Sequence, residues 1–300
     1  MIEIQNLTKR FGPVTALNQV SFTVPDGSIF GLIGSNGAGK STLLRTLSGV
    51  YRPSAGQALL DGTPPYEDPQ VKARLRFVAD EPWLPARSTL RRLADGLSRF
   101  YKSWDEKGFQ KLCAMFPVPA DKPLGSLSKG QRRQASLVLA LASRPDFLFL
   151  DEAFDGLDPV VRKLLKRVLA GEVADRGMTV LVASHNLREL EDLCDTIALL
   201  HKGGVVLEEE LDQMRLGLHR VQAVFRKTPD LDTLRQKLCV VSAEQSGSVL
   251  SFVARGNGEE ILEALDSFSP EFRELVPLSL EEVFISEMEA AGYDIENILN

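Results

Sequence analysis

Residues Gly34 to Thr42 read GSNGAGKST, and this stretch decides the fold of the chain. Two glycines that are separated by four residues and followed by Lys and Ser satisfy the phosphate-loop pattern. The apolar run from Ile29 to Ile33 predicts a short buried strand before it, and the leucines at helical spacing from Lys40 to Leu47 predict a helix after it. Such a strand, turn and helix are expected to bind phosphate, because the helix points its positive end at the turn.

The residue types in this stretch suit phosphate binding. Glycine lets backbone N–H groups face phosphate oxygens with no side chain in the way. Lys40 is predicted to reach the β- and γ-phosphates of a nucleotide, and the Ser41 hydroxyl to ligate Mg²⁺. The residues predicted to hold the phosphates are Gly34, Ser35, Asn36, Gly37, Ala38, Gly39, Lys40, Ser41 and Thr42. The alternative, a chance glycine-rich turn, is disfavoured by a match that extends over all nine residues.

The composition is that of a globular protein that can bury a substantial core. The 300 residues are 44% hydrophobic and 25% charged, with a formal net charge of −6. The negative charge gives no support to a nucleic-acid partner, and none is expected. No apolar run is long enough to span a bilayer, and the N-terminal sequence MIEIQNLTKRFG has no apolar signal core. We therefore expect a cytosolic protein, with three isolated cysteines that are buried hydrophobic residues rather than disulfide or zinc ligands.

The rest of the chain predicts an α/β fold with two domains. Strand-like runs at Met1–Leu7 and Ala16–Val24 indicate an antiparallel layer, and later strands alternate with helical patterns, which indicates a largely parallel sheet wrapped by helices. A helical stretch over about residues 86–142 interrupts this alternation and is predicted to be an inserted lobe. After about residue 210 the predicted order is βαββαβ, which is typical of a split-βαβ sandwich. The expected domains are residues 1–210 and an accessory α+β domain over residues 211–300.

Two carboxylates follow the predicted buried strand at Phe147 to Leu150, where the sequence reads FLFLDE. Such a strand delivers Asp151 to the tip of the sheet, where open α/β folds bind ligands. Asp151 is predicted to bind Mg²⁺ together with the phosphate-loop hydroxyl. Glu152 is predicted to polarise the water that attacks the γ-phosphate. A plain acidic strand end is the alternative, but the phosphate loop favours the catalytic interpretation.

A second candidate anion site lies at Leu127 to Gln131, which read LSKGQ ahead of a predicted helix. With this motif the chain resembles the ATP-binding subunits of ABC transporters, whose signature is LSGGQ; Lys129 stands here in place of a Gly. The resemblance implies the P-loop NTPase fold of an ABC cassette, with a mixed sheet, an antiparallel layer and an inserted helical lobe. It also implies that Ser128, Gly130 and Gln131 cap the nucleotide held by the phosphate loop of a second subunit. A simple helix start is the alternative for the pentapeptide alone.

The resemblance covers about residues 1–210 and assigns three further residues. Phe11 matches the aromatic residue that stacks on adenine, although it could be an ordinary core residue. Asp158 lies in the loop that crosses to the partner subunit, and it could also be the N-cap of a helix. His185 follows the predicted strand Thr179–Ala183 and matches the histidine that contacts the γ-phosphate.

One position departs from the family pattern. The family usually has Gln at the end of the strand before the helical lobe, where it contacts Mg²⁺ and the attacking water. This chain has Asp80 there, in the stretch FVADEP. An Asp can still ligate a metal, so Asp80 is predicted to join Ser41 and Asp151 around Mg²⁺. A solvated acidic loop is the alternative.

The resemblance implies hydrolysis of ATP to ADP and phosphate by a dimer of two cassettes, either identical or different. Because no membrane span is predicted, separate transmembrane permease subunits are implied, with this chain at the inner face of the membrane. Residues Ser279 to Phe284 read SLEEVF and resemble the tail of cassettes that serve bacterial exporters of drugs, antibiotics and peptides. An ABC-type ATPase outside transport, whether regulatory or associated with nucleic acid or ribosomes, is the alternative. The coiled-coil arms, tandem cassettes and zinc cysteines of several such ATPases are missing from the sequence.

Overall fold

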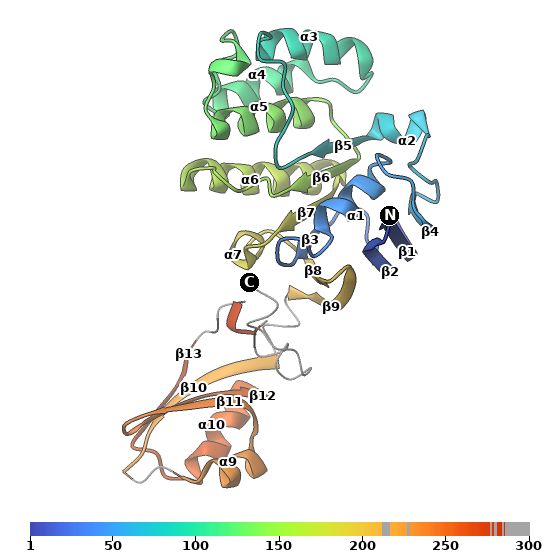
Figure 1. The fold of residues 1–300 in the computed structure, drawn as a ribbon. Coiled ribbons are helices and arrows are strands. Elements are labelled where there is room, and N and C mark those ends of the chain that lie inside the picture. Colours follow the sequence, from blue (N-terminus) through green and yellow to red (C-terminus); the bar gives the residue numbers. More distant parts are fainter. Residues whose placement is uncertain (212–216, 227–228, 277, 279–280, 284, 286–300) are drawn as a thin grey trace. The chain divides into compact units, whose positions relative to one another are not determined.

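The fold is taken from a computed structural model, which describes residues 1–211, 217–226, 229–276, 278, 281–283 and 285. The chain divides into two compact units, Met1–Glu208 and Glu209–Asn300 (Figure 1). Of the exporter-like tail, Ser279, Leu280 and Phe284 lie outside the described residues.

A six-stranded sheet forms the centre of the first unit, with the strand order β5-β6-β7-β3-β8-β9. Its strands are β3 (Ile29–Ile33), β5 (Leu75–Val78), β6 (Phe147–Asp151), β7 (Thr179–Ser184), β8 (Thr196–His201) and β9 (Gly204–Glu210). The pairs from β5 to β8 are parallel, which confirms the predicted largely parallel sheet. Because parallel strands end at the same edge, the segments that follow β3, β6 and β7 lie side by side.

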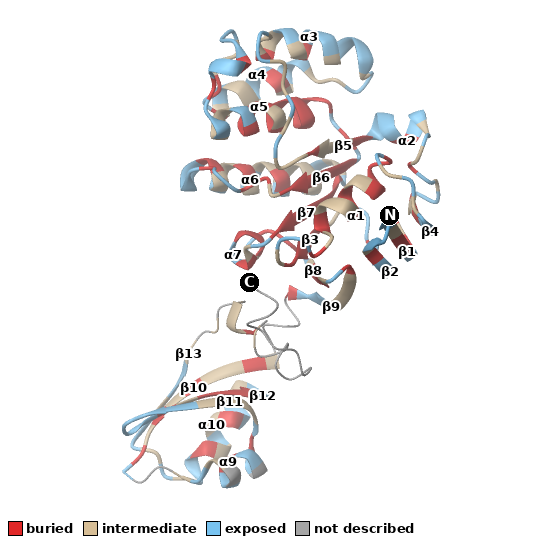
Figure 2. Ribbon diagram, in the orientation of Figure 1, coloured by how far each residue is buried: buried red, intermediate tan, exposed pale blue. Residues whose placement is uncertain are grey.

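An antiparallel layer covers one face of this sheet. It has the order β2-β1-β4, from β1 (Ile2–Phe11), β2 (Val14–Val24) and β4 (Ala55–Leu60). Its buried side chains pack with helix α1 (Lys40–Leu47) and with residues of β3, β6, β7 and β8 in one continuous core. The strands of the central sheet are accordingly among the most buried parts of the unit (Figure 2).

The inserted lobe consists of helices α3 (Leu90–Phe100), α4 (Glu106–Met115) and α5 (Lys129–Ala142), with a short 3₁₀ turn at Leu124–Ser126 (Figure 1). Thr89, Asp105 and Ser128 cap the three helices by accepting hydrogen bonds from first-turn N–H groups. Helix α5 packs on both other helices of the lobe and on β5, and it therefore joins the lobe to the sheet.

Three helices differ from the sequence-based expectation. Helix α2 (Pro69–Arg74) was not predicted, although Asp68 caps it and Pro69 occupies its first turn. Helix α6 (Pro159–Arg176) is longer than the predicted Val160–Ala170, because it continues to a left-handed Gly177. Helix α7 (Leu187–Leu190) is shorter than the predicted Leu187–Leu193.

The second unit has its own sheet and core. Its elements are β10 (Leu218–Val224), α9 (Leu231–Lys237), β11 (Cys239–Ser246), β12 (Val249–Arg255), α10 (Gly258–Asp266) and β13 (Phe272–Val276). The strand order is β11-β12-β10-β13 and all three pairs are antiparallel. This arrangement confirms the predicted split-βαβ order, and one sheet face packs on both helices to form a separate apolar core.

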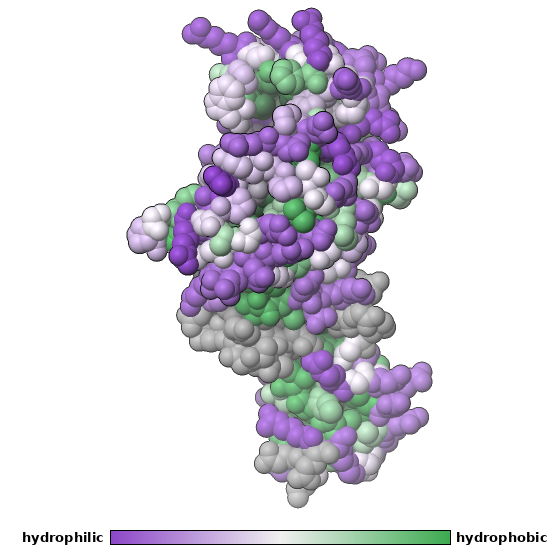
Figure 3. All heavy atoms as spheres, turned by 90° about the vertical axis from the view of Figure 1, so that its right-hand side faces the viewer, coloured by the Kyte–Doolittle hydropathy of each residue, from purple (hydrophilic) through white to green (hydrophobic). Residues whose placement is uncertain are grey.

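The surface and the cysteines complete the description. Hydrophilic residues predominate on the face of the first unit shown in Figure 3, and among the described residues no helix is long and apolar enough to cross a membrane. All three cysteines are free. Only Cys194 is buried as predicted, whereas Cys113 is half-buried and Cys239 is exposed, so the prediction was wrong for these two.

Candidate active site

Three neighbouring strands bring the predicted site residues to one edge of the sheet. Strand β3 leads into the phosphate loop, β6 ends at Asp151, and β7 ends at Ser184 beside His185. The register aligns Ile33 with Ser184 and Asp151 with Ala183, so the three strands end at the same level. The phosphate loop, the two carboxylates and the histidine therefore share one site.

Lys40 lies at the centre of this site. Its side chain is only 5% exposed, and its ammonium group donates to the main-chain oxygens of Gly34, at 2.6 Å, and Ser35, at 3.3 Å. It also forms an ion pair with Glu152, at 3.2 Å between Nζ and Oε1. This cation is thus positioned by the loop that it follows.

The start of helix α1 is shaped for a close ligand. The N-cap is Gly39, with φ of 113°, so no side chain occupies the first-turn N–H groups. A Cβ at Gly39 would come within 2.8 Å of the Ala16 oxygen, so glycine is also required by the close packing of the loop. Free N–H groups at a helix N-terminus are suited to bind phosphate oxygens.

Ser41 and Asp151 form a hydrogen-bonded pair, with 2.9 Å between Oγ and Oδ1. The other carboxylate oxygen of Asp151 is buried and has no hydrogen-bond partner in the described part of the chain. Burial raises the pKa of Asp151, the hydrogen bond from Ser41 lowers it, and the charge of Glu152 raises it further. A buried carboxylate oxygen without a partner beside a hydroxyl suits a hard cation such as Mg²⁺.

The described residues contain no group of three His, Cys, Asp or Glu side chains that could hold a metal on their own.

Glu152 connects Lys40 to His185. Its Oε2 lies 2.9 Å from Nδ1 of His185 and 3.3 Å from the backbone nitrogen of the same residue. The backbone of Glu152 is left-handed, with φ of 49°, which is unusual for a residue other than glycine. The His185 ring is half-exposed, so this edge of the cluster is open to solvent.

The residues of the LSKGQ motif begin helix α5. The Ser128 hydroxyl accepts from the Gln131 N–H, and the Gln131 side chain accepts from the Ser128 N–H, each at 3.2 Å. This capping box shows that the motif starts a helix. Its two hydrogen bonds join Ser128 and Gln131 and do not use the N–H group of Gly130. A Cβ at Gly130 would lie 2.9 Å from the Gly156 oxygen, so the helix start packs closely on the loop before Asp158.

Asp158 is the N-cap of helix α6. Its carboxylate accepts from the N–H groups of Val160 and Val161, both at 3.0 Å. Phe11, in contrast, is not a core residue, since the residue is 42% exposed. The ring lies edge-on to Tyr51 and 4.8 Å from the ammonium of Lys9, two neighbours that the sequence did not indicate.

Asp80 is paired with a residue that the sequence-based prediction missed. Its carboxylate lies 2.5 Å from the guanidinium of Arg133. Burial is the main cause of the raised pKa of Asp151, and the charge of Asp80 makes a smaller contribution in the same direction. In the sequence, Arg133 is marked only as one of two arginines that directly follow LSKGQ.

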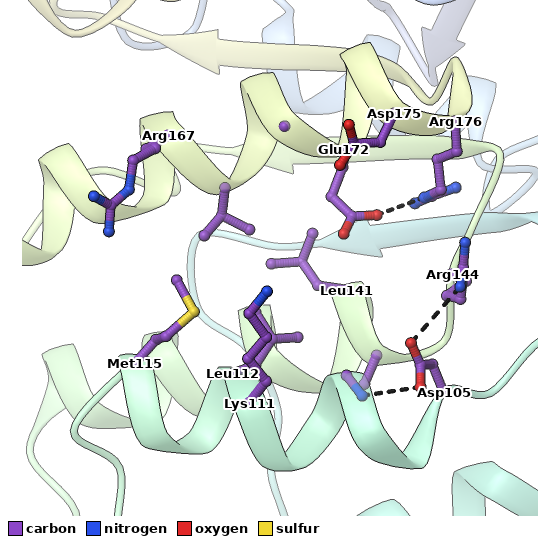
Figure 4. Close-up of a pocket in the computed structure, with 14 residues that line it drawn as sticks. Asp105, Lys111, Leu112, Met115, Leu141, Arg144, Arg167, Glu172, Asp175 and Arg176 are labelled. Atoms are coloured by element: carbon purple, nitrogen blue, oxygen red, sulfur yellow. Dashed lines mark hydrogen bonds and ion pairs between the residues drawn. The ribbon is translucent and has the colours of Figure 1, made fainter.

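A separate cavity of about 410 Å³ lies between helices α4 and α6 and the end of α5 (Figure 4). Its rim carries the ion pairs Asp105–Arg144 and Glu172–Arg176, and Leu141 contributes to its apolar lining. None of the predicted site residues lines this cavity.

Comparison with known proteins identifies relatives of the chain. Residues 17–155 match the family model described as ABC transporter. The chain is 31% identical over 287 residues to the ABC transporter ATP-binding protein YtrB of Bacillus subtilis, covering 96% of this chain and 98% of that protein. It is 33% identical to the Nod factor export ATP-binding protein I of Burkholderia lata, covering 83% and 84%. It is also 35% identical to the ribose import ATP-binding protein RbsA of Pseudomonas putida, covering 69% of this chain but only 43% of that protein.

Among solved structures, the chain is similar to one described as the ATP-binding subunit of an ABC transporter. The TM-score is 0.66 with 26% sequence identity, and the match covers 72% of this chain and 92% of the other.

Proposed function

This chain belongs to the family of ABC transporter ATP-binding proteins, and we propose that it hydrolyses ATP to power an exporter. The observation that carries the proposal is the cluster at the edge of the sheet. Lys40 and His185 both contact the carboxylate of Glu152, and Ser41 is bonded to Asp151 beside it. In a phosphoryl-transfer site, catalysis comes mainly from positioning and from stabilising charge on the transferred group.

Each residue has a proposed role in this reaction. Lys40 and the N–H groups of the phosphate loop bind the β- and γ-phosphates, and His185 contacts the γ-phosphate. Ser41 and Asp151 would hold Mg²⁺, which would neutralise phosphate charge. Glu152 accepts the proton of the attacking water, and Lys40 and His185 hold its carboxylate in place.

The complete nucleotide site is proposed to need two cassettes. Ser128, Gly130 and Gln131 of one subunit would close on the γ-phosphate held by the other, and Phe11 would stack on adenine. Asp158 would reach the partner through the loop that it ends. Separate permease subunits would span the membrane, with this chain bound to them at the inner face. The partner cassette can be a second copy or a different chain.

The direction of transport is proposed to be export. The support is the tail sequence SLEEVF and the similarity to the Nod factor export protein along most of both chains. The similarity to the ribose import protein covers less than half of that relative, so it supports import more weakly.

Three measurements test this proposal. Purified protein should release phosphate from ATP in the presence of Mg²⁺, and Glu152→Gln should lose this activity. Purification from detergent-solubilised membranes should recover a membrane-spanning partner. Phosphate release without such a partner would instead support an ATPase outside transport, and transport assays with the recovered permease in vesicles would establish the direction.

A further inference from the structure

The guanidinium group of Arg133 joins three parts of the first unit. Arg133 lies on helix α5 and is only 1% exposed. Its Nη1 donates to the main-chain oxygens of Glu152, at 2.5 Å, and of Asp155. Its Nη2 donates to the main-chain oxygen of Asp80 and pairs with the Asp80 carboxylate. We call this arrangement of Arg133, Asp80 and the carbonyl groups of Glu152 and Asp155 the Arg133 clamp.

The geometry of the clamp requires both arginine and a nearby carboxylate. A guanidinium presents several donors in one rigid plane, whereas the ammonium of a lysine is a single point charge. A buried cation is also unfavourable unless an anion compensates it. Asp80 supplies that anion at 2.5 Å, while the carboxylate of Asp155 is 3.9 Å away; both carboxylates are half-exposed, so the distance distinguishes them. Gln, the usual residue of the family at this position, would carry no charge and could not compensate the Arg133 cation as Asp80 does.

The clamp acts on the backbone of Glu152. The left-handed conformation of this residue is unfavourable for a side chain with a Cβ and needs support from its surroundings. The N–H of Glu152 donates to the Ala183 oxygen at 2.9 Å, and its C=O accepts from Arg133. These two bonds fix the peptide groups on both sides of Glu152. They thereby determine where its carboxylate points, namely toward Lys40 and His185.

We propose that Arg133 is a positioning residue for ATP hydrolysis and that Asp80 is the counterion that allows its burial. This inference rests on the proposed ATPase function. Arg133 orients Glu152 through the main chain, and it fixes the loop at Asp155 to the helix that begins with the LSKGQ motif. The two sets of interactions have different effects. The ion pair of Asp80 with Arg133 stabilises the fold, and the bonds from Arg133 to the Glu152 and Asp155 oxygens raise kcat.

The test compares four full-length variants with the parent: Arg133→Gln, Asp80→Asn, the double variant, and Arg132→Gln. Arg132 is the matched control, because it is the adjacent, exposed arginine of the same helix. Arg133→Gln should lower kcat by about 10- to 100-fold, the usual range for residues that orient a catalytic group. KM for ATP should change by less than about threefold, because the phosphate loop is untouched.

Thermal unfolding separates the two consequences. Asp80→Asn leaves a buried cation without its anion, so this variant should melt at a lower temperature than the double variant. The double variant should recover stability but keep the low kcat of Arg133→Gln. The carbonyl groups of Glu152 and Asp155 still lack the bonds from Arg133, and the Glu152 oxygen keeps only the bond from the Asp155 N–H, at 3.1 Å. If Arg133 had only a structural role, the double variant would instead recover its melting temperature and its kcat together.

Two results would overturn the inference: a double variant with the kcat of the parent, or an Arg133→Gln variant that behaves like Arg132→Gln. If Arg133→Gln does not fold, Arg133→Lys replaces it; this variant keeps the charge pair and should still have a lowered kcat, and a parental kcat would contradict the inference. A parent chain that hydrolyses no ATP would contradict the proposed function instead, and the melting temperatures would still test the pairing of Asp80 with Arg133.

Discussion

At the scale of single residues, Lys40 has the position that determines nucleotide binding. It is nearly buried, and in the described part of the chain its ammonium group forms an ion pair with one carboxylate, that of Glu152, which is itself a proposed catalytic group. Its other partners are carbonyl oxygens of its own loop. Phosphate oxygens are stronger partners for a cation than neutral carbonyl oxygens, so a nucleotide can recruit Lys40 without breaking a core interaction.

Lys40→Ala is expected to lower the rate of ATP hydrolysis by about 10²–10³-fold, as removal of one positioned charge stabiliser does. The rate of phosphate release at saturating Mg-ATP measures the effect. Lys111→Ala, a change at an exposed lysine on α4, is the control and should retain the parental rate. Activity of Lys40→Ala within about twofold of the parent would contradict the assignment of the whole site.

At the scale of elements, the helix starts in the first unit are at the same time structural caps and proposed contact points. Asp158 satisfies two N–H groups of α6, and Ser128 satisfies one of α5. The close approach of Gly130 to the oxygen of Gly156 brings these two helix starts together. A change at either helix start is therefore expected to affect both stability and the contact with a partner subunit.

Asp158→Ala should cost about 1 kcal/mol of unfolding free energy through loss of the cap, whereas Asp158→Asn should cost much less because Asn also caps helices well. Thermal unfolding of both variants measures this contribution. The ATPase rate of Asp158→Asn then tests the proposed role of the carboxylate charge in contacting the partner subunit, because this variant keeps the cap and lacks the charge. Equal stability of the Ala and Asn variants would show that the cap contributes nothing measurable.

At the scale of the whole molecule, two cores make two folding units. The core of the first unit joins the antiparallel layer, helix α1 and the central sheet, while the second unit has its own core between one sheet and two helices. All proposed site residues belong to the first unit. We propose that the second unit is an accessory domain that pairs subunits or regulates the permease.

A chain that ends after residue 211 should therefore retain nucleotide binding, because it contains every proposed nucleotide contact. Titration with a fluorescent ATP analogue gives the affinity, and circular dichroism shows whether the shortened chain is folded. Loss of binding in a folded chain would mean that the second unit contributes to the nucleotide site.

Glu152→Gln should turn the protein into a dimer held by ATP. Gln keeps the size of Glu and its ability to form hydrogen bonds but cannot accept a proton as a carboxylate does. The phosphate loop and Asp151 are unchanged, so ATP still binds, and uncleaved ATP stabilises the dimer by mass action. Size-exclusion chromatography with and without Mg-ATP measures the change. A variant that stays monomeric at saturating ATP would contradict the shared site, and a variant with the parental ATPase rate would remove Glu152 from catalysis.

The sequence by itself determined the order of the main elements, the phosphate loop and the carboxylates after β6, because each of these depends on neighbours along the chain. Glycines at required turns, apolar runs and cap residues are local signals. Helix α2 and the full length of α6 were missed, although the sequence has local signals for them at Asp68 and Gly177. Only the tertiary structure decided the contacts of Arg133. Its three acceptor residues lie 19, 22 and 53 residues away, and each accepts through its main-chain oxygen. Every residue has such an oxygen, so these contacts leave no pattern in the sequence.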